Sequence, residues 1–202
     1  MTGSSISRFA RMGIVALASL ALTACGINSV PTAEEAAKAR WADVQAAFQE
    51  RANLVPNLAE VAKSAAEQER AILTDVIEAR AKATSIQISG DDLNDPAKMQ
   101  QFQQAQEQLG AGLGRLLANV ERYPELKSIT NYQMLQSQLE GQENRIRVAI
   151  RDYNGAVQAY NTTIRTFPDA IGAKVFYGAK PMVPYEAATP GAEVAPSLEG
   201  KL

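Results

Sequence analysis

The sequence predicts an all-α protein, an antiparallel four-helix bundle of long helices in up-down-up-down order. Apolar residues recur at helical spacing along four segments, the connections between these segments are short, and no stretch alternates apolar and polar residues as a strand does. The chain has 202 residues, which is enough for one domain with a single hydrophobic core.

Residues 1–24 are predicted to be a lipoprotein signal peptide. Arg8 and Arg11 precede an uncharged apolar run, which is the order typical of such peptides. The run ends in L-T-A-C-G, which resembles the bacterial lipoprotein box, and the resemblance implies that the Cys25 thiol is lipidated after cleavage before it. The alternative is an uncleaved membrane helix over residues 12–30, since this stretch is nearly long enough to span a bilayer. Either form predicts a membrane tether.

Residues 25–34 are predicted to be a tether, and the bundle is predicted over residues 35–178. Thr32 is expected to cap the first helix, because Glu35 three residues later can complete a capping box. The helix is expected to end before Pro56, since proline removes a backbone donor and disfavours helix at the preceding residue. A kinked continuous helix is the alternative.

The second helix is predicted from Pro56 to about residue 84, followed by an acidic loop. Asp95 and Pro96 then predict the N-cap and first position of the third helix. This helix contains three alternate glycines. They predict either a close approach to a neighbouring helix or a local weak point. The glycines are Gly110, Gly112 and Gly114.

The fourth helix has the clearest apolar repeat. The third helix is expected to end at Tyr123-Pro124, with the fourth starting a few residues later and ending at Pro168. Residues 179–202 are rich in proline and alanine and poor in large apolar residues, so they are predicted to be a disordered tail. The repeat of the fourth helix consists of Tyr132, Leu135, Leu139, Ile146, Ala149, Tyr153, Val157, Tyr160, Ile164 and Phe167.

The composition excludes several classes of function. The 20 basic residues are balanced by 22 acidic ones and form no clustered basic segment, so nucleic acid is not an expected partner. The chain has no histidine, the commonest general base and transition-metal ligand, so we expect no metal and no cofactor. With its single cysteine assigned to lipid, the chain offers no recognisable pair of nucleophile and base, and we expect no enzymatic activity.

Several motifs in order give the chain a family resemblance. They are R-x-x-L-V-P-N-L from Arg51, Y-P-E-L-K from Tyr123, two Y-N pairs at residues 153 and 160, and F-P at residue 167. Over residues 35–178 the chain resembles the LemA family. The resemblance implies a four-helix bundle held to a membrane by its N-terminus, with no established enzymatic activity. Members are often encoded near membrane or envelope peptidases.

We therefore expect a non-enzymatic, membrane-anchored lipoprotein that acts as a scaffold or accessory protein at the cell envelope. The expected partner is another envelope or membrane protein, a peptidase being one candidate. The expected location is extracytoplasmic, on the periplasmic side. The glycine after Cys25 favours the inner leaflet of the outer membrane if the cell is Gram-negative. The alternative function is a small-ligand module with a pocket between helices.

Candidate docking residues lie at the expected helix junctions and on the last helix. For all of them, capping, turn formation or core packing is the alternative role; in particular, the asparagines of the Y-N pairs could bond across helices. The candidates are Arg51, Asn53, Pro56, Asn57, Tyr123, Pro124, Lys127, Asn154 and Asn161.

Overall fold

The structure is a computed structural model that describes the backbone of residues 3–63, 70–120 and 130–186. Side chains are described for residues 28–61, 71–119 and 130–186. The elements in chain order are α1 (Gly3–Lys63), α2 (Arg70–Ser85), the 3-10 turn η1 (Gly90–Asn94), α3 (Pro96–Val120), α5 (Thr130–Thr163), α6 (Asp169–Gly172) and the π-helical turn η2 (Ala173–Tyr177). The described residues form no strand, and the all-α prediction is confirmed.

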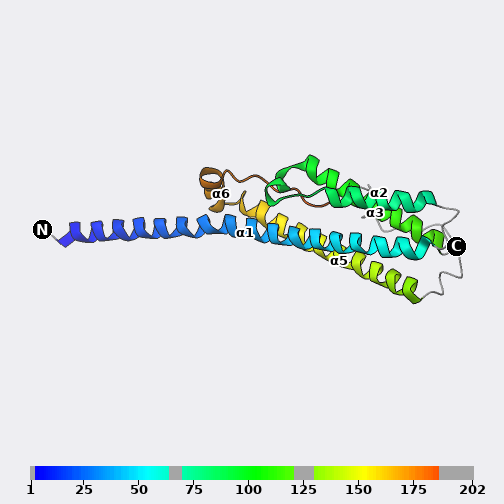
Figure 1. Ribbon diagram of the computed structural model, residues 1–202. Coiled ribbons are helices and arrows are strands. Elements are labelled where there is room, and N and C mark those ends of the chain that lie inside the picture. Colours follow the sequence, from blue (N-terminus) through cyan, green and yellow to red (C-terminus); the bar gives the residue numbers. More distant parts are fainter. Residues whose placement is uncertain (1–2, 64–69, 121–129, 187–202) are drawn as a thin grey trace, which may run out of the picture.

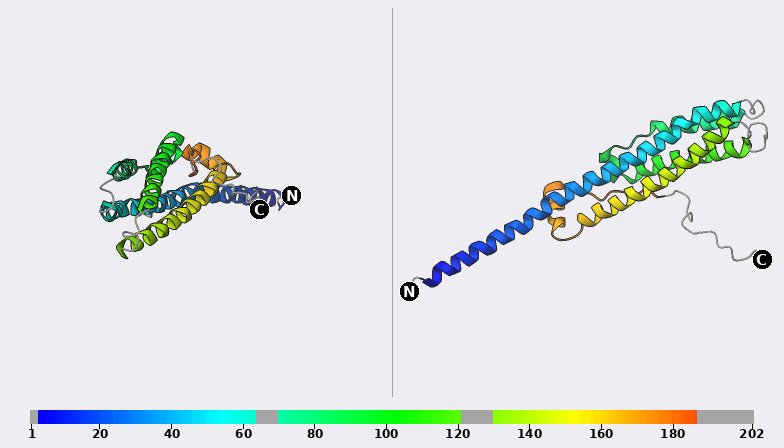
Figure 2. Two further views of the ribbon diagram at one scale, coloured as in Figure 1. Left: turned by 90° about the vertical axis from the view of Figure 1, so that its right-hand side faces the viewer. Right: turned by 90° about the horizontal axis from the view of Figure 1, so that it is seen from below.

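Four long helices, α1, α2, α3 and α5, make up the described part of the body (Figure 1). Helix α1 packs along α5, while α2 packs along α3, and this second pair lies against α1 (Figure 2). Helix α1 also continues well beyond the body toward the N-terminus. We call the end of the body from which α1 continues the near end, and the opposite end, where α1 stops at Lys63, the far end.

Helix α1 is continuous where the sequence predicted a helix start at Thr32 and a helix end before Pro56. Both Pro31 and Pro56 lie inside it, so the expected end before Pro56 is wrong and the continuous alternative is correct. The Thr32 hydroxyl donates to the carbonyl of Asn28 at 2.7 Å instead of capping a helix start. Pro56 is exposed beside the fully buried Val55. Core contacts around the proline therefore maintain the helix despite the missing backbone donor.

Two other helix boundaries test the sequence analysis. The Asp95 carboxylate accepts hydrogen bonds from the backbone N–H of Ala97 at 2.9 Å and of Lys98 at 3.3 Å, so the predicted N-cap of α3 is confirmed. Helix α5 ends at Thr163, and the Phe167 side chain is 82% exposed, so its assignment to the buried repeat is wrong. The expected end of α3 at residues 123–124 lies outside the described residues.

The core consists of two clusters along the body. The near cluster contains Val30, Ala37, Trp41, Val44, Ala47, Phe48, Ile88, Leu93, Met99, Phe102, Ile146, Tyr153, Val157, Tyr160, Ala173 and Met182. The far cluster contains Ala52, Val55, Leu58, Val76, Ala83, Ala105, Leu109, Leu113, Leu116, Tyr132, Leu135 and Leu139. Helices α1, α3 and α5 contribute to both clusters, whereas α2 contributes to the far cluster.

Residues 179–186 form no helix or strand and follow an extended path along the body (Figure 1), which corrects the prediction of a disordered tail from residue 179. Met182 is buried in the near cluster, and the backbone N–H of Val183 donates to the carbonyl of Leu93 at 2.9 Å. One buried side chain and a set of polar contacts fix a segment whose composition is too poor in apolar residues to form a core. We call residues 179–186 the C-terminal strap.

Some predictions fall on residues that the structure does not describe. The predicted signal peptide over residues 1–24 and the predicted lipidation of Cys25 depend on side chains that the structure does not describe. The part of the predicted tail over residues 187–202 also lies outside the described residues. Within residues 28–61, 71–119 and 130–186, no helix has both the length and the apolar character needed to cross a membrane.

Candidate functional site

The C-terminal strap lies along α5 and is bound by the two tyrosine–asparagine pairs of that helix. Asn161 donates through Nδ2 to the Met182 carbonyl at 2.9 Å and accepts from the Met182 N–H through Oδ1 at 2.8 Å. Asn154 forms the same two bonds with Tyr185, at 2.9 Å and 2.8 Å. Each amide thus satisfies both backbone groups of one strap residue, which requires an extended backbone at that position.

The tyrosines of the two pairs bind the same strap at two other backbone carbonyls. The Tyr160 hydroxyl donates to the carbonyl of Lys180 at 3.1 Å, and the Tyr153 hydroxyl donates to that of Val183 at 2.8 Å. Both rings are buried in the near cluster. Each aromatic ring therefore packs in the core while its hydroxyl reaches the strap, a usual arrangement for buried tyrosine.

The spacing of the pairs on α5 matches the spacing of their targets on the strap. Seven residues of α-helix advance about 10.5 Å, while three residues of extended chain advance about 10 Å. The tyrosines bind Lys180 and Val183, three residues apart, and the asparagines bind Met182 and Tyr185, also three apart. The two Y-N pairs, seven residues apart on α5, therefore bind the extended main chain of the strap at two places three residues apart.

The prolines of the strap occupy positions at which no donor is required. Pro181 directly precedes the first residue whose N–H donates, Met182, and Pro184 lies between the donors Val183 and Tyr185. A proline also favours extended backbone at the residue before it. The sequence K-P-M-V-P-Y therefore favours the extended conformation that α5 binds.

Tyr185 packs the end of the strap against α1. Its ring stacks on Phe48 with centroids 5.9 Å apart, and burial raises its pKa above the ordinary value near 10. Burial likewise raises the pKa of Tyr153 and of Tyr160, with Glu34 adding to the effect at Tyr160. All three phenols therefore remain protonated at neutral pH, as donation by Tyr153 and Tyr160 requires.

Arg51, one of the expected docking residues, faces the interior between the two clusters. Its Nη2 donates to the Gln106 carbonyl at 2.9 Å and to the Gln106 side-chain oxygen at 3.1 Å. Its Nη1 pairs with the Glu143 carboxylate at 3.0 Å, and its guanidinium lies 5.0 Å from the centroid of the Phe48 ring. Arg51 therefore joins α1 to α3 and α5, and it does not present its charge to a partner.

The other expected docking residues separate into three groups. Asn53, Pro56 and Asn57 are exposed on α1 in its far half, and we call them the far corner. Asn154 and Asn161 bind the strap rather than a neighbouring helix. The third group, Tyr123, Pro124 and Lys127, lies outside the described residues.

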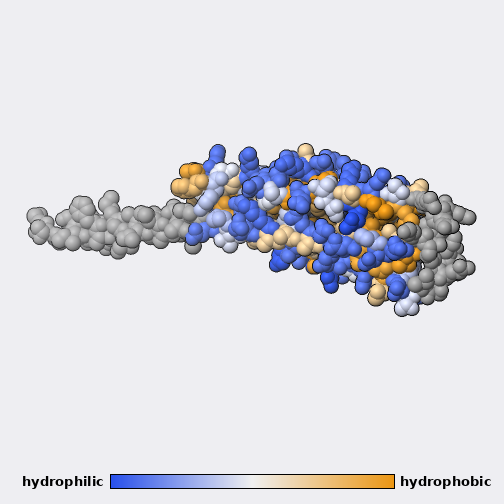
Figure 3. Space-filling model, viewed as in Figure 1, coloured by the Kyte–Doolittle hydropathy of each residue, from blue (hydrophilic) through white to orange (hydrophobic). Residues whose placement is uncertain are grey.

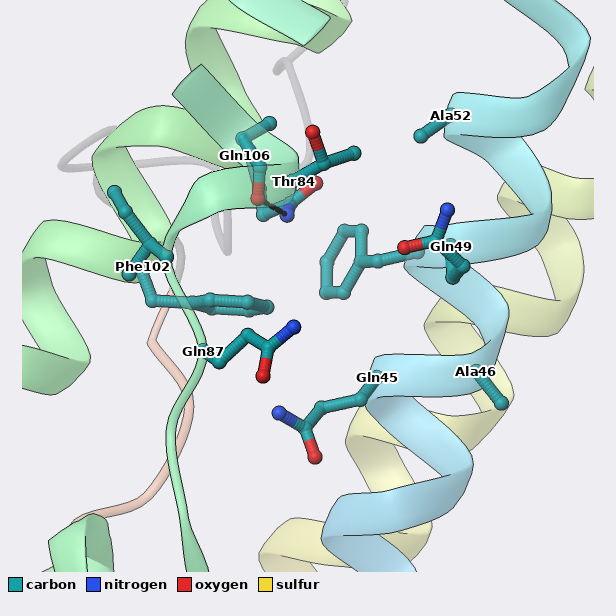
Figure 4. A pocket seen from close by; sticks show the side chains of 11 residues that line it. Gln45, Ala46, Gln49, Ala52, Thr84, Gln87, Phe102 and Gln106 are labelled. Carbon is teal, nitrogen blue, oxygen red and sulfur yellow. Dashed lines mark hydrogen bonds between the residues drawn. The ribbon is translucent and has the colours of Figure 1, made fainter. Parts of the chain in front are cut away.

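An open cleft of about 330 Å³ is lined by α1, the end of α2, the segment that follows it and α3 (Figure 4). Gln45, Gln49, Gln87 and Gln106 extend their amides toward it, beside the Phe102 ring. Gln45 donates to the Ile88 carbonyl at 3.1 Å and Gln106 donates to the Ala83 carbonyl at 3.2 Å. The amides and the one hydroxyl of the lining can form hydrogen bonds, while the other lining groups are apolar. None of these lining groups titrates near neutral pH.

Comparison with protein families identifies the chain. The LemA family model matches residues 40–199. The chain belongs to the LemA family. The match includes the C-terminal strap, so in this LemA-family protein the strap lies within the matched domain and not after it.

Curated relatives of this LemA-family protein carry the name magnetosome protein. Magnetosome protein MamQ 2 of Paramagnetospirillum magneticum is 41% identical over 59 residues, which cover 29% of this chain and 22% of the relative. Magnetosome protein MamQ of Magnetospirillum gryphiswaldense is 26% identical over 157 residues, which cover 70% of this chain and 58% of the relative. The chain therefore matches less than two thirds of the length of each.

The sequence analysis found the Y-N pairs but not what they bind. The available signal was the match between the seven-residue spacing of the pairs and the three-residue spacing of the prolines at 181 and 184. The composition of the tail obscured this signal, because composition measures apolar burial and not the pairing of backbone groups.

Proposed function

We propose that this LemA-family protein is a non-enzymatic accessory protein of the cell envelope that is tethered to a membrane and docks another envelope protein. Its four long helices are arranged as an up-down-up-down bundle. The N-terminus supplies the tether, through lipid on Cys25, and the domain lies outside the cytoplasm on the periplasmic side. A membrane peptidase is a candidate partner.

The continuity of α1 is the observation that carries this proposal. One helix runs from the apolar N-terminal run, through the near cluster, to the far corner. From Val30 to Pro56 it advances about 40 Å at 1.5 Å per residue. A membrane tether and a docking surface on the same helix would lie at a fixed separation, which suits a protein that holds a partner at a set height above a bilayer.

The interior polar side chains described above bond within the domain, which leaves the exposed far corner as the docking surface. The Y-N pairs, Arg51 and the glutamines of the cleft form hydrogen bonds to backbone and amide groups. Among the described acidic side chains, Asp92 has a pKa lowered to about 2 by its hydrogen bonds with Lys98 and Ser89, which favours a permanent carboxylate over a proton shuttle. The relatives named magnetosome proteins are consistent with an accessory role in assembling cellular structures.

The tether is tested by metabolic labelling with an alkyne fatty acid. We expect label on the wild-type chain, none on Cys25→Ser, and a mature mass that begins at residue 25. An unlabelled wild type that keeps its N-terminus and remains in the membrane fraction would establish the uncleaved helix instead. A wild-type chain found in the soluble fraction would contradict the tether in both forms.

Docking is tested by a photo-crosslinking residue placed at Asn57 in intact cells. Ala42 is a matched control, because it is also exposed on α1 but lies about 22 Å nearer the N-terminus at 1.5 Å per residue. We expect one discrete product from position 57 that is absent from position 42, and recovery of the same complex with a crosslinker on the partner. Identical products from both positions would refute docking at the far corner.

A further inference from the structure

Large apolar side chains are exposed together at the near end of the body. They follow α5 on the turn that includes α6 and η2, and Figure 3 shows apolar surface at this place. Their exposed fractions range from 42% to 82%. The side chains are Phe167, Ile171, Val175, Phe176 and Tyr177. We call them the near-end patch.

The near-end patch is held beside the part of α1 that continues to the N-terminus (Figure 1). Helix α6 contacts α1, and Ala173 belongs to the same buried cluster as Val30. The apolar N-terminal run ends at Ala24, six residues before Val30, which is about 9 Å along the helix axis. A bilayer that holds this run, or a lipid on Cys25, would therefore have its surface close to the patch.

The charge around the patch favours an anionic surface. Residues 165–180 contain three basic side chains and one acidic one, whereas the whole chain has a net charge of −2. Arg165, Lys174 and Lys180 are all exposed. Aromatic and aliphatic side chains flanked by lysine and arginine are the usual composition of segments that lie in the interface of anionic membranes.

We propose that the near-end patch inserts into the interface of the lipid bilayer and forms a second membrane contact beside the N-terminal tether. This inference rests on the membrane tether proposed above. A lipid surface is favoured over a protein partner, because a protein docked on the patch would have to share the narrow space between the body and the headgroups. Two contacts side by side would fix the tilt of α1, and so the direction in which the far corner points.

The contact is measured by tryptophan quenching in the full chain. The variant Val175→Trp places the probe on the patch, while the native Trp41 is only 2% exposed and gives a constant background. The chain is reconstituted into vesicles of equal parts phosphatidylcholine and phosphatidylglycerol, with and without brominated acyl chains. Because a side chain in the interface lies within reach of the acyl chains, we expect emission from the introduced probe to fall about twofold or more.

The matched control is Met134→Trp, since Met134 is 52% exposed on α5 toward the far end. Its quenching should equal that of the wild type. Adding Phe176→Glu to Val175→Trp should reduce the quenching, because a carboxylate is repelled by the anionic surface.

Sedimentation of the same vesicles separates the two proposals. Chain that sediments with equal quenching at positions 175 and 134 would overturn the patch contact and leave the tether standing. Chain that remains in the supernatant would overturn both.

Discussion

The near and far clusters are built largely from the same helices but are held together by different interactions. The near cluster contains a tryptophan, two phenylalanines and two tyrosines, whereas the far cluster is aliphatic except for Tyr132. In the near cluster Trp41 lies 5.3 Å from Phe102 and 5.0 Å from Tyr153 between ring centroids. Its indole N–H donates to the Ile88 carbonyl at 3.1 Å. The far cluster relies on leucine, valine and alanine packed between α1, α2, α3 and α5.

This difference shows how one domain can be stable along its whole length and still fix single positions for its loop and strap at one end. Aliphatic side chains contribute stability without direction, since the hydrophobic effect is roughly proportional to buried area. The aromatic side chains of the near cluster add polar atoms that must be paired, and these atoms select one position for the strap and for the loop at Ile88. Arg51 marks the boundary, stacked on Phe48 and bonded to Gln106.

Truncating the aromatic centre of the near cluster should have the largest effect. We expect Trp41→Ala to lower the free energy of unfolding by about 3 to 5 kcal/mol, because it removes a large buried ring and leaves a cavity. It also leaves the Ile88 carbonyl without its indole donor. Chemical denaturation of the full chain measures the loss, and hydrogen exchange reports whether the strap remains protected.

The matched variant in the far cluster is Leu109→Ala, since Leu109 is fully buried. It should cost about 2 to 5 kcal/mol and leave exchange in the strap unchanged at low denaturant. Faster exchange at Met182 in both variants would show that the two clusters form one cooperative unit and would remove the distinction between them.

Reversing one polar contact of the strap should have a smaller effect. The variant Asn161→Asp keeps the acceptor for the Met182 N–H but replaces the donor that faces the Met182 carbonyl with a carboxylate oxygen. We expect a loss of about 1 to 3 kcal/mol, the usual result of leaving polar groups unpaired. Amide exchange at Met182, Val183 and Tyr185 should accelerate, while exchange in α2 and α3 should not change.

Asn144→Asp is the control for that variant, because Asn144 is an exposed asparagine on the same helix. It introduces the same charge away from the strap, so the strap should stay protected. Equal acceleration by both variants would mean that charge on α5, rather than the lost donor, releases the strap.

High pH should loosen the near end before the far end. Burial raises the pKa of Tyr153, Tyr160 and Tyr185 above the usual 10. Between pH 10 and their folded-state pKa values, the folded chain binds more protons than the unfolded chain. The stability contribution of these tyrosines is therefore complete below pH 10 and declines as pH rises further. Absorbance of tyrosinate measures the titration.

Unfolding the chain should restore ordinary titration of these three tyrosines. Tyr160→Phe should remove one late-titrating group and weaken the strap. If every tyrosine of the folded chain titrated together near pH 10, the buried donors assigned to the strap would be ruled out.

The helices could be predicted from the sequence because their signals are local. The buried positions of α5 follow the predicted apolar repeat as far as Tyr160, and Asp95 caps α3 as its position before Pro96 indicated. The break at Pro56 was wrong because a local rule competes with tertiary packing, and the buried neighbours of Pro56 maintain the helix.

The strap could not be predicted from the same signals. Its position depends on Asn154 and Asn161 meeting residues more than 20 positions later in the chain. Apolar periodicity contains no information about such pairing. Likewise, nothing local distinguished Arg51, whose partners lie 55 and 92 residues away, from an exposed arginine at a docking corner.

The smallest expected effect concerns the glycines of α3 in the far half. Glycine inside a helix costs about 0.5 to 1 kcal/mol relative to alanine, so replacement should stabilise the protein wherever a methyl group fits. A Cβ at Gly114 meets no atom within 4 Å, whereas one at Gly112 would lie 3.3 Å from Cγ2 of Val76. We therefore expect Gly114→Ala to raise the free energy of unfolding by about 0.5 to 1 kcal/mol and Gly112→Ala to gain less or to destabilise.

Denaturation of the two variants in parallel distinguishes the two roles proposed for the glycines: close approach at Gly112, and local weakness at Gly114. Equal gains at both positions would show that α2 can shift away from Gly112. The far cluster would then be adaptable in the way its aliphatic composition suggests, in contrast to the near cluster, where paired polar atoms prevent such a shift.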